Sequence, residues 1–138
     1  MYVVYLLIFL IAGFHIGSFL SVIAFRVPRH ESFILGSSHC DSCNHNLKWY
    51  EMIPIFSYIL QRGQCKHCGS KIPGVLFISE VLTGILFLLS FYIFGFTYSL
   101  LIALGLVCFF ILVLVSDTQY LIIPDSFIIF FSIYFFRR

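Results

Sequence analysis

Charged side chains are scarce in this chain of 138 residues. Aspartate, glutamate, lysine and arginine together make up 10% of it, whereas hydrophobic residues make up 61%. The sequence also lacks internal repeats, low-complexity tracts and a glycine-rich nucleotide loop, which argues against repeat arrays and P-loop nucleotide-binding proteins. Its basic residues are scattered, and only Trp49 and Tyr50 offer an aromatic platform, so we expect no direct binding of nucleic acid. The composition instead indicates a membrane protein.

Long apolar runs support this interpretation. A helix needs about 20 apolar residues to cross the hydrocarbon core, and three stretches meet that length: residues 2–25, 75–94 and 97–116. Gly95 marks a tight turn between the last two. The first run is too long, and its start too poor in positive charge, for a cleaved signal peptide. We therefore predict an all-α integral membrane protein with three full transmembrane helices and a partial fourth that begins at Phe127.

The one long polar stretch, residues 26–74, separates the first two spans. It is rich in basic residues, and short cationic loops between spans are typically cytoplasmic. This rule places the N-terminus outside and brings the end of the third span, at Asp117, to the cytoplasmic side with the loop. We expect a short helix near Ile53–Leu60. The charged residues of the loop are Arg26, Arg29, Lys48, Arg62, Lys66 and Lys71 against Glu31, Asp41 and Glu51.

Four cysteines in this loop form two Cys-x-x-Cys pairs, Cys40/Cys43 and Cys65/Cys68, with 21 residues between the pairs. Two such pairs can complete a tetrahedral site with four thiolates about 2.3 Å from a zinc ion. Disulfides are the alternative, but the cytoplasm keeps thiols reduced. The pattern predicts a structural zinc site, although four thiolates also suit iron. His39, His45 and His67 lie close by in sequence; one could replace a thiolate, but we expect them to be solvated.

Polar residues inside the spans have mainly structural interpretations. Gly13, Gly17, Ser18 and Ser21 form a small-residue seam that favours close helix packing, His15 is expected to be a hydrogen-bonded core histidine, and Cys108 a small apolar filler. Glu80 is different, because a carboxylate about one turn into a span is costly. It is either a functional-site residue or an interfacial carboxylate that reaches towards Lys71 or the loop.

Two further acids lie near the membrane edge. Asp125 follows Pro124 and can cap the helix that starts at Phe127. Asp117 has a weaker structural explanation, and a carboxylate at this position can act as a general acid or base. An aspartic protease, however, needs a second carboxylate close to the first.

At this point the chain resembles a known family, the type IV prepilin leader peptidases, which are membrane aspartic proteases of the Gly-x-Gly-Asp class. The resemblance runs nearly end to end. It is carried by Gly17-Ser18-Phe19-Leu20-Ser21-Val22, Arg26-Val27-Pro28, both Cys pairs, Leu47-Lys48-Trp49-Tyr50, Ile53-Pro54-Ile55-Phe56-Ser57-Tyr58, Arg62-Gly63-Gln64-Cys65-Lys66-His67-Cys68-Gly69, Ser79-Glu80-Val81-Leu82-Thr83, Asp117 and Ile123-Pro124-Asp125.

The resemblance implies a set of roles. Asp117 would be the first catalytic aspartate, Asp125 would belong to the same motif without being the catalytic acid, and the cytoplasmic loop would carry zinc. Such enzymes sit in the bacterial plasma membrane and cut the basic leader from prepilins or competence pseudopilins at its cytoplasmic face. Many also methylate the new N-terminus with S-adenosylmethionine.

The sequence departs from the family in one respect: no Gly-x-Gly-Asp motif is present, and no glycine follows Gly105. The fourth apolar run stops after ten residues at Arg137, about half a bilayer. We therefore expect a truncated chain with an N-terminal unit, residues 1–95, and the opening of the peptidase unit, residues 96–138, that is inactive by itself. The alternative is a non-enzymatic membrane protein whose zinc loop binds a partner, with Asp117 and Asp125 as helix caps.

Overall fold

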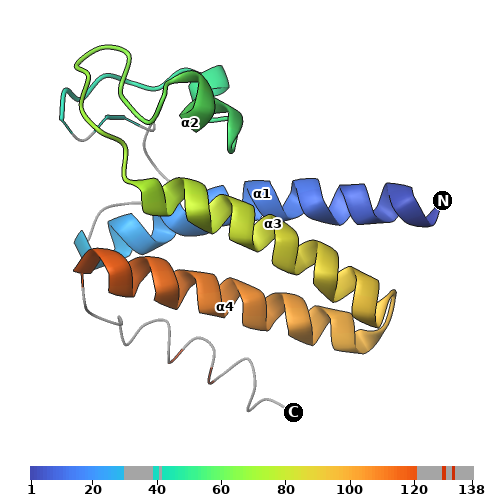
Figure 1. Cartoon of the computed structure of the whole chain (residues 1–138). Helices are drawn as coiled ribbons and strands as arrows, with labels where there is room; N and C mark the ends of the chain where they lie inside the picture. The colour runs from blue at the N-terminus through green and yellow to red at the C-terminus, as the bar shows by residue number, and fades with distance from the viewer. Residues whose placement is uncertain (30–38, 41, 121–128, 130–131, 133–138) are drawn as a thin grey trace.

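The computed structural model describes residues 1–29, 39–40, 42–120, 129 and 132, and the regular secondary structure of this part is helical apart from two isolated β-bridges. Three long helices run side by side, and shorter ones lie in the loop that joins the first two (Figure 1). Each long helix is long and apolar enough to cross a membrane, which confirms the predicted all-α membrane fold. The elements are α1 Tyr2–Arg26, η1 Val27–Arg29, η2 Trp49–Glu51, α2 Phe56–Leu60, α3 Gly74–Phe94 and α4 Tyr98–Tyr120.

The turn between α3 and α4 forms at the predicted glycine. Gly95 has a φ of 54°, a left-handed conformation that glycine adopts without a steric penalty, and its N–H donates to the Phe91 carbonyl at 2.8 Å. Helix α4 then continues to Tyr120, four residues beyond the expected end of the third span. Asp117 consequently lies within the last turn of α4. The expected partial fourth helix from Phe127 falls outside the described residues.

Helices α1 and α3 approach each other closely along the predicted small-residue seam. A Cβ atom added at Gly13 would lie 2.7 Å from the Gly84 Cα atom, and one added at Gly17 would lie 2.7 Å from Thr83 Oγ1. One turn further, the hydroxyls of Ser21 and Ser79 are 2.7 Å apart and fully buried. The seam prediction is therefore confirmed for Gly13, Gly17 and Ser21.

Helix α4 packs against the same end of α1 through a buried apolar cluster: Leu20, Ala24, Ile111, Leu112 and Val115. The Tyr120 hydroxyl donates to the Phe25 carbonyl at 3.0 Å and closes this end of the bundle. Because the three helices alternate in direction, the last turns of α1 and α4 and the first turn of α3 lie at one end (Figure 1). Asp117 is thus at the end of the bundle from which the cysteine-containing loop extends.

The seam predicts a sharp difference between two Gly→Ala substitutions. Gly17→Ala should destabilise the bundle by about 1–3 kcal/mol, because the new methyl group would overlap the α3 side chain and push the helices apart. Gly74→Ala, at the start of α3, is the matched control, because its Cβ would meet only the Tyr58 hydroxyl at an ordinary 3.7 Å. The measurement is the unfolding midpoint in mixed detergent and SDS micelles. Equal midpoints for the two variants would show that the seam is not tightly packed.

Candidate metal centre and adjoining cavity

The four loop cysteines come together into a single cluster. The sulfur atoms of Cys40, Cys43, Cys65 and Cys68 all lie within 4.8 Å of one another, with 3.8 Å between Cys40 and Cys68 and 4.0 Å between Cys43 and Cys65. Four sulfurs arranged tetrahedrally about 2.3 Å from one ion would be about 3.8 Å apart. All five cysteines of the chain are free thiols. The cluster could therefore hold a metal ion.

The two Cys-x-x-Cys turns have the same backbone geometry. The N–H groups of Cys40 and Cys65 each donate to the carbonyl five residues later, at 3.0 and 2.8 Å, and each carbonyl accepts from the N–H four residues later at 2.8 Å. That fourth residue has a left-handed conformation in both turns, with φ of 53° at Asn44 and 71° at Gly69. Because each turn aims two sulfurs to one side, the pair encloses a single site.

Ser70 joins the two turns through its hydroxyl group. Ser70 Oγ lies 3.1 Å from the sulfur of Cys68 and 3.6 Å from that of Cys40. This hydroxyl, together with backbone N–H groups, lowers the pKa of Cys40 from 9.0 to about 6 and lowers the pKa of Cys68. A hydrogen-bond donor at this place favours the thiolate form, which is the form that binds metal. Ser70 drew no attention in the sequence, although its position five residues after Cys65 was a usable signal.

The neighbouring histidines are not part of the sulfur cluster. His39 and His67 are exposed, as expected. His45 differs from the expectation of a solvated residue: its ring lies 3.5 Å from that of His67, centroid to centroid, and its Nε2 atom is buried with no hydrogen-bond partner among the described residues. The turn that follows Cys43 folds this ring inward, which the sequence did not indicate.

Glu80 joins the loop to the membrane helices. Its side chain is 9% exposed, and its Oε2 atom accepts the N–H of Ile55 at 2.7 Å. Ile55 has a φ of 65°, which is strained for a β-branched residue. The hydrogen bond to Glu80 supports this conformation. The sequence suggested either a functional-site residue or a carboxylate that reaches towards Lys71 or the loop. The structure shows a contact with the loop, and this contact is made to the backbone of Ile55.

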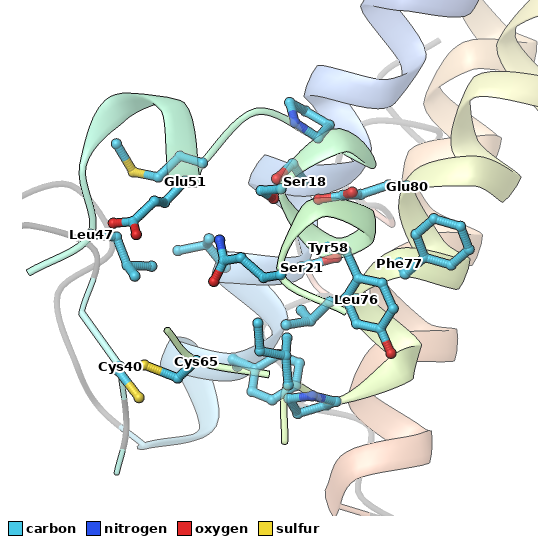
Figure 2. Close-up of a pocket in the computed structure, with 18 of the residues that line it drawn as sticks. Ser18, Ser21, Cys40, Leu47, Glu51, Tyr58, Cys65, Leu76, Phe77 and Glu80 are labelled. Carbon is cyan, nitrogen blue, oxygen red and sulfur yellow. The ribbon is translucent and has the colours of Figure 1, made fainter. Parts of the chain in front are cut away.

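A cavity of about 530 Å³ lies between the loop and the ends of α1 and α3. Ser18 faces the carboxylate of Glu80 on one side of it, and Cys40 and Cys65 border it on the other (Figure 2). Its lining is mixed in charge, with two acids and three basic residues: Glu51, Glu80, Arg26, Arg29 and Lys71. Cavities of this size commonly accept small ligands or peptide segments.

Two other residues of this cavity had been expected to lie inside the helix bundle. His15 is exposed and lines the cavity, with its Nδ1 atom 2.9 Å from the Ile11 carbonyl, so the expectation of a core histidine was wrong, although it is hydrogen-bonded. Ser18 also turns to the cavity and not only to the helix seam. His15 lies two residues from both Gly13 and Gly17, and Ser18 directly follows Gly17, so the turn of the helix points these side chains towards the loop.

The catalytic candidates lie apart from this cavity. Asp117 is exposed in the last turn of α4 and does not line the cavity. Asp125 falls outside the described residues. The structure therefore brings Glu80 together with the metal-site loop, whereas Asp117 lies at the same end of the bundle but outside the cavity.

Comparison with known proteins identifies relatives of this arrangement. Residues 11–94 match the model of the family described as Bacterial Peptidase A24 N-terminal domain. No solved structure matches.

Three similar proteins are named prepilin leader peptidase/N-methyltransferase. The one from Myxococcus xanthus is 39% identical over 116 residues, which cover 84% of this chain and 35% of the relative. The one from Bacillus subtilis is 36% identical over 124 residues, 90% of this chain and 50% of the relative. The one from Vibrio cholerae is 37% identical over 101 residues, 67% of this chain and 37% of the relative.

This chain thus spans half or less of the length of these three relatives. The match includes most of α1, the whole metal-site loop and α3, which are the elements that form the sulfur cluster and the cavity. The chain therefore belongs to the bacterial peptidase A24 family.

Proposed function

We propose that this protein takes part in cleaving the leader peptide of type IV prepilins or competence pseudopilins at a membrane surface. The observation that carries the proposal is the family match over residues 11–94, which includes both Cys pairs and Glu80. Relatives that match most of this chain bear the name prepilin leader peptidase/N-methyltransferase. The division into an N-terminal unit, residues 1–95, and a peptidase unit from residue 96 belongs to this proposal.

Asp117 is the proposed first catalytic aspartate. It would act with a second carboxylate, one activating water as a base while the other protonates the carbonyl oxygen of the scissile bond. The other carboxylates in the described part of the chain, Glu51 and Glu80, line the cavity and not the end of α4. The second acid must therefore come from outside the described residues. Asp125 is assigned to the motif and not to the chemistry.

The position of Asp117 suits a substrate that is itself anchored in the bilayer. A prepilin would insert its apolar stem between lipids and leave its basic leader in the aqueous phase, so that its scissile bond lies at the membrane edge. Asp117 lies in the final turn of an apolar helix, which supports a position at that same depth. We infer from the basic residues of the loop that this end of the bundle faces the cytoplasm of a bacterium and that the protein lies in its plasma membrane.

The proposal predicts that Asp117 is essential for cleavage. The chain should be joined to a downstream segment carrying Gly-x-Gly-Asp from a longer relative and assayed in membranes with a prepilin. Asp117→Asn should then lower kcat/KM by about 10²–10⁴-fold, because an amide cannot transfer the proton. The measurement is the appearance of shortened pilin on gels, confirmed by mass spectrometry.

Asp125→Asn in the same fusion is the matched control and should retain measurable cleavage. Equal loss in both variants would mean that these acids maintain the local fold and do not perform the reaction. Unchanged cleavage in Asp117→Asn would rule out its assignment as the catalytic aspartate.

The sulfur cluster is proposed as a structural zinc site. Within the described loop residues, only Cys65 and Pro54 have buried apolar side chains, so the loop has little apolar core to hold its shape. Four thiolates around one Zn²⁺ form a closed site without an open position for substrate, which suits a structural role. The Ser70 hydroxyl would hydrogen-bond two of these sulfurs and fix their orientation.

This proposal predicts one zinc ion per chain in protein purified from membranes. Cys40→Ser combined with Cys65→Ser removes one thiolate from each turn and should abolish zinc binding, because two remaining thiolates make a much weaker site. Cys108→Ser, within α4, is the control and should keep full occupancy. Metal content is measured by inductively coupled plasma mass spectrometry. Stoichiometric iron, or equal zinc in both variants, would contradict the assignment.

Acidic side chains are proposed to attract the basic leader. The loop as a whole is cationic, so we propose that Glu80, Asp117 and Asp125 supply most of the attraction. Within the cavity, Glu51 contributes as well, since the backbone N–H of Lys48 lowers its pKa and favours the carboxylate.

Glu80→Gln tests this attraction while keeping an oxygen that can accept the Ile55 N–H. The variant should bind a basic leader peptide about three- to tenfold more weakly at low salt, and the difference should shrink as salt screens the charge. Binding is measured by fluorescence anisotropy in nanodiscs, with Gln61→Asn as a neutral control. An unchanged affinity at low salt would remove Glu80 from leader recognition.

We also propose that the N-terminus exposed by cleavage is methylated. This proposal rests on the word N-methyltransferase in the names of the relatives. S-adenosylmethionine would be the methyl donor and therefore a substrate bound in each cycle.

A further inference from the structure

An apolar surface on the loop stays uncovered by the rest of the described chain. We call it the loop patch, and its most exposed members are Trp49 at 74%, Leu60 at 74% and Phe56 at 67%. Concentrated apolar exposure of this kind marks a binding surface. The full loop patch consists of Trp49, Met52, Ile53, Phe56, Ile59 and Leu60.

The loop patch is held beside the membrane helices and not beyond their ends. Ile55, in the middle of the patch sequence, is hydrogen-bonded to Glu80, and the Tyr58 ring stacks on Phe77 with 5.0 Å between centroids. Glu80 is six residues past the first residue of α3, which is about 9 Å along the helix axis. Figure 1 shows α2 accordingly alongside the bundle. Since α3 as a whole is about as long as the hydrocarbon core is thick, this anchor point lies within the membrane-crossing segment.

The surface of α3 at the same level also carries an exposed apolar side chain. Ile78, two residues before Glu80, is 57% exposed and does not line the cavity. In a membrane helix such an outward side chain contacts lipid. The loop patch therefore lies at the level of a surface that the bilayer covers.

Two lysines lie at one border of the loop patch, as is typical of membrane interfaces. The ammonium groups of Lys48 and Lys66 lie 5.9 and 5.8 Å from the centre of the Tyr50 ring, at the border of the patch. Residues 42–72 contain four lysines and arginines and one acid, Glu51. Lysine and tyrosine at the edge of an apolar surface can reach lipid headgroups while the apolar side chains enter the acyl region.

We propose that the loop patch inserts into the bilayer that the three helices cross, so that the metal-site loop lies on an anionic lipid surface. Phe56, Ile59 and Leu60 enter the boundary between headgroups and acyl chains, and Lys48 and Lys66 contact phosphate and carboxylate groups above it. This assignment is independent of the proposed cleavage reaction, because it rests on exposure, anchoring depth and charge. A protein partner is the competing occupant.

The chain carries its own probe, because Trp49 is its only tryptophan. The full 138-residue protein is reconstituted into phosphatidylcholine–phosphatidylglycerol vesicles whose lipids carry bromine at shallow or deep acyl positions. Shallow bromines should quench Trp49 emission strongly and deep bromines less, since an interfacial side chain penetrates only about 5–10 Å. Iodide in the aqueous phase should quench it weakly.

Two relocated tryptophans calibrate the measurement in a Trp49→Phe background. Leu89→Trp, exposed on the side of α3, should be quenched by the deep bromines, whereas Gln64→Trp, on the loop outside the patch, should be quenched by iodide. Trp49 quenched by iodide and not by lipid would overturn the proposal. Trp49 shielded from both would also overturn it and would identify a protein surface as the occupant.

A second variant separates insertion from folding of the loop. Phe56→Asn with Leu60→Asn changes only exposed side chains, so zinc content should stay the same while iodide quenching of Trp49 rises. In vesicles of phosphatidylcholine alone, iodide quenching should rise as well, because the lysines lose their anionic partners. If neither these substitutions nor the lipid charge changed the iodide quenching of Trp49, the result would contradict insertion.

Discussion

The close approach of α1 and α3 is the constraint on which the rest of the structure depends. Glycines at positions 13, 17 and 84 let the two backbones nearly touch, and in a bilayer such contacts replace the hydrophobic effect as the source of helix association. The end of α1 and the start of α3 are also the two ends of the loop. Their contact therefore fixes where the loop leaves and re-enters the membrane, and with it the place of the sulfur cluster.

Polar groups at this helix pair specify how the loop is attached. Ser21 and Ser79 satisfy each other inside the bundle, while Glu80, one residue further along α3, turns outward and accepts the N–H of Ile55. A buried carboxylate is costly without such partners, so this contact favours one arrangement of the loop over others. Glu80 and the loop border the cavity, whereas the exposed Asp117 lies outside it at the end of α4.

The sequence was informative where one physical rule dominated. Run length determined the three spans, and the doubled Cys-x-x-Cys spacing determined the sulfur cluster, because both depend on local geometry. It was less informative where the outcome depends on how elements meet. His45 packs against His67 and Ser70 contacts two sulfurs because the two cysteine turns meet in the fold. His15 lines a cavity because the loop folds back beside α1. The extension of α4 past Ser116 was missed because polar residues at a membrane edge do not end a helix.

The anchoring of Ile55 by Glu80 has a further consequence for the entropy of the loop. More than 40 residues connect α1 to α3, and loops of that length without secondary structure are uncommon in compact domains. A metal ion in the sulfur cluster would tie Cys43 to Cys65, and the Glu80 contact ties the chain halfway between them. No free segment from Cys43 to the start of α3 would then exceed about a dozen residues, so the cost of ordering each one stays small. The metal ion and the Glu80 contact would thus hold the loop in one conformation, which in a larger domain is the role of an apolar core.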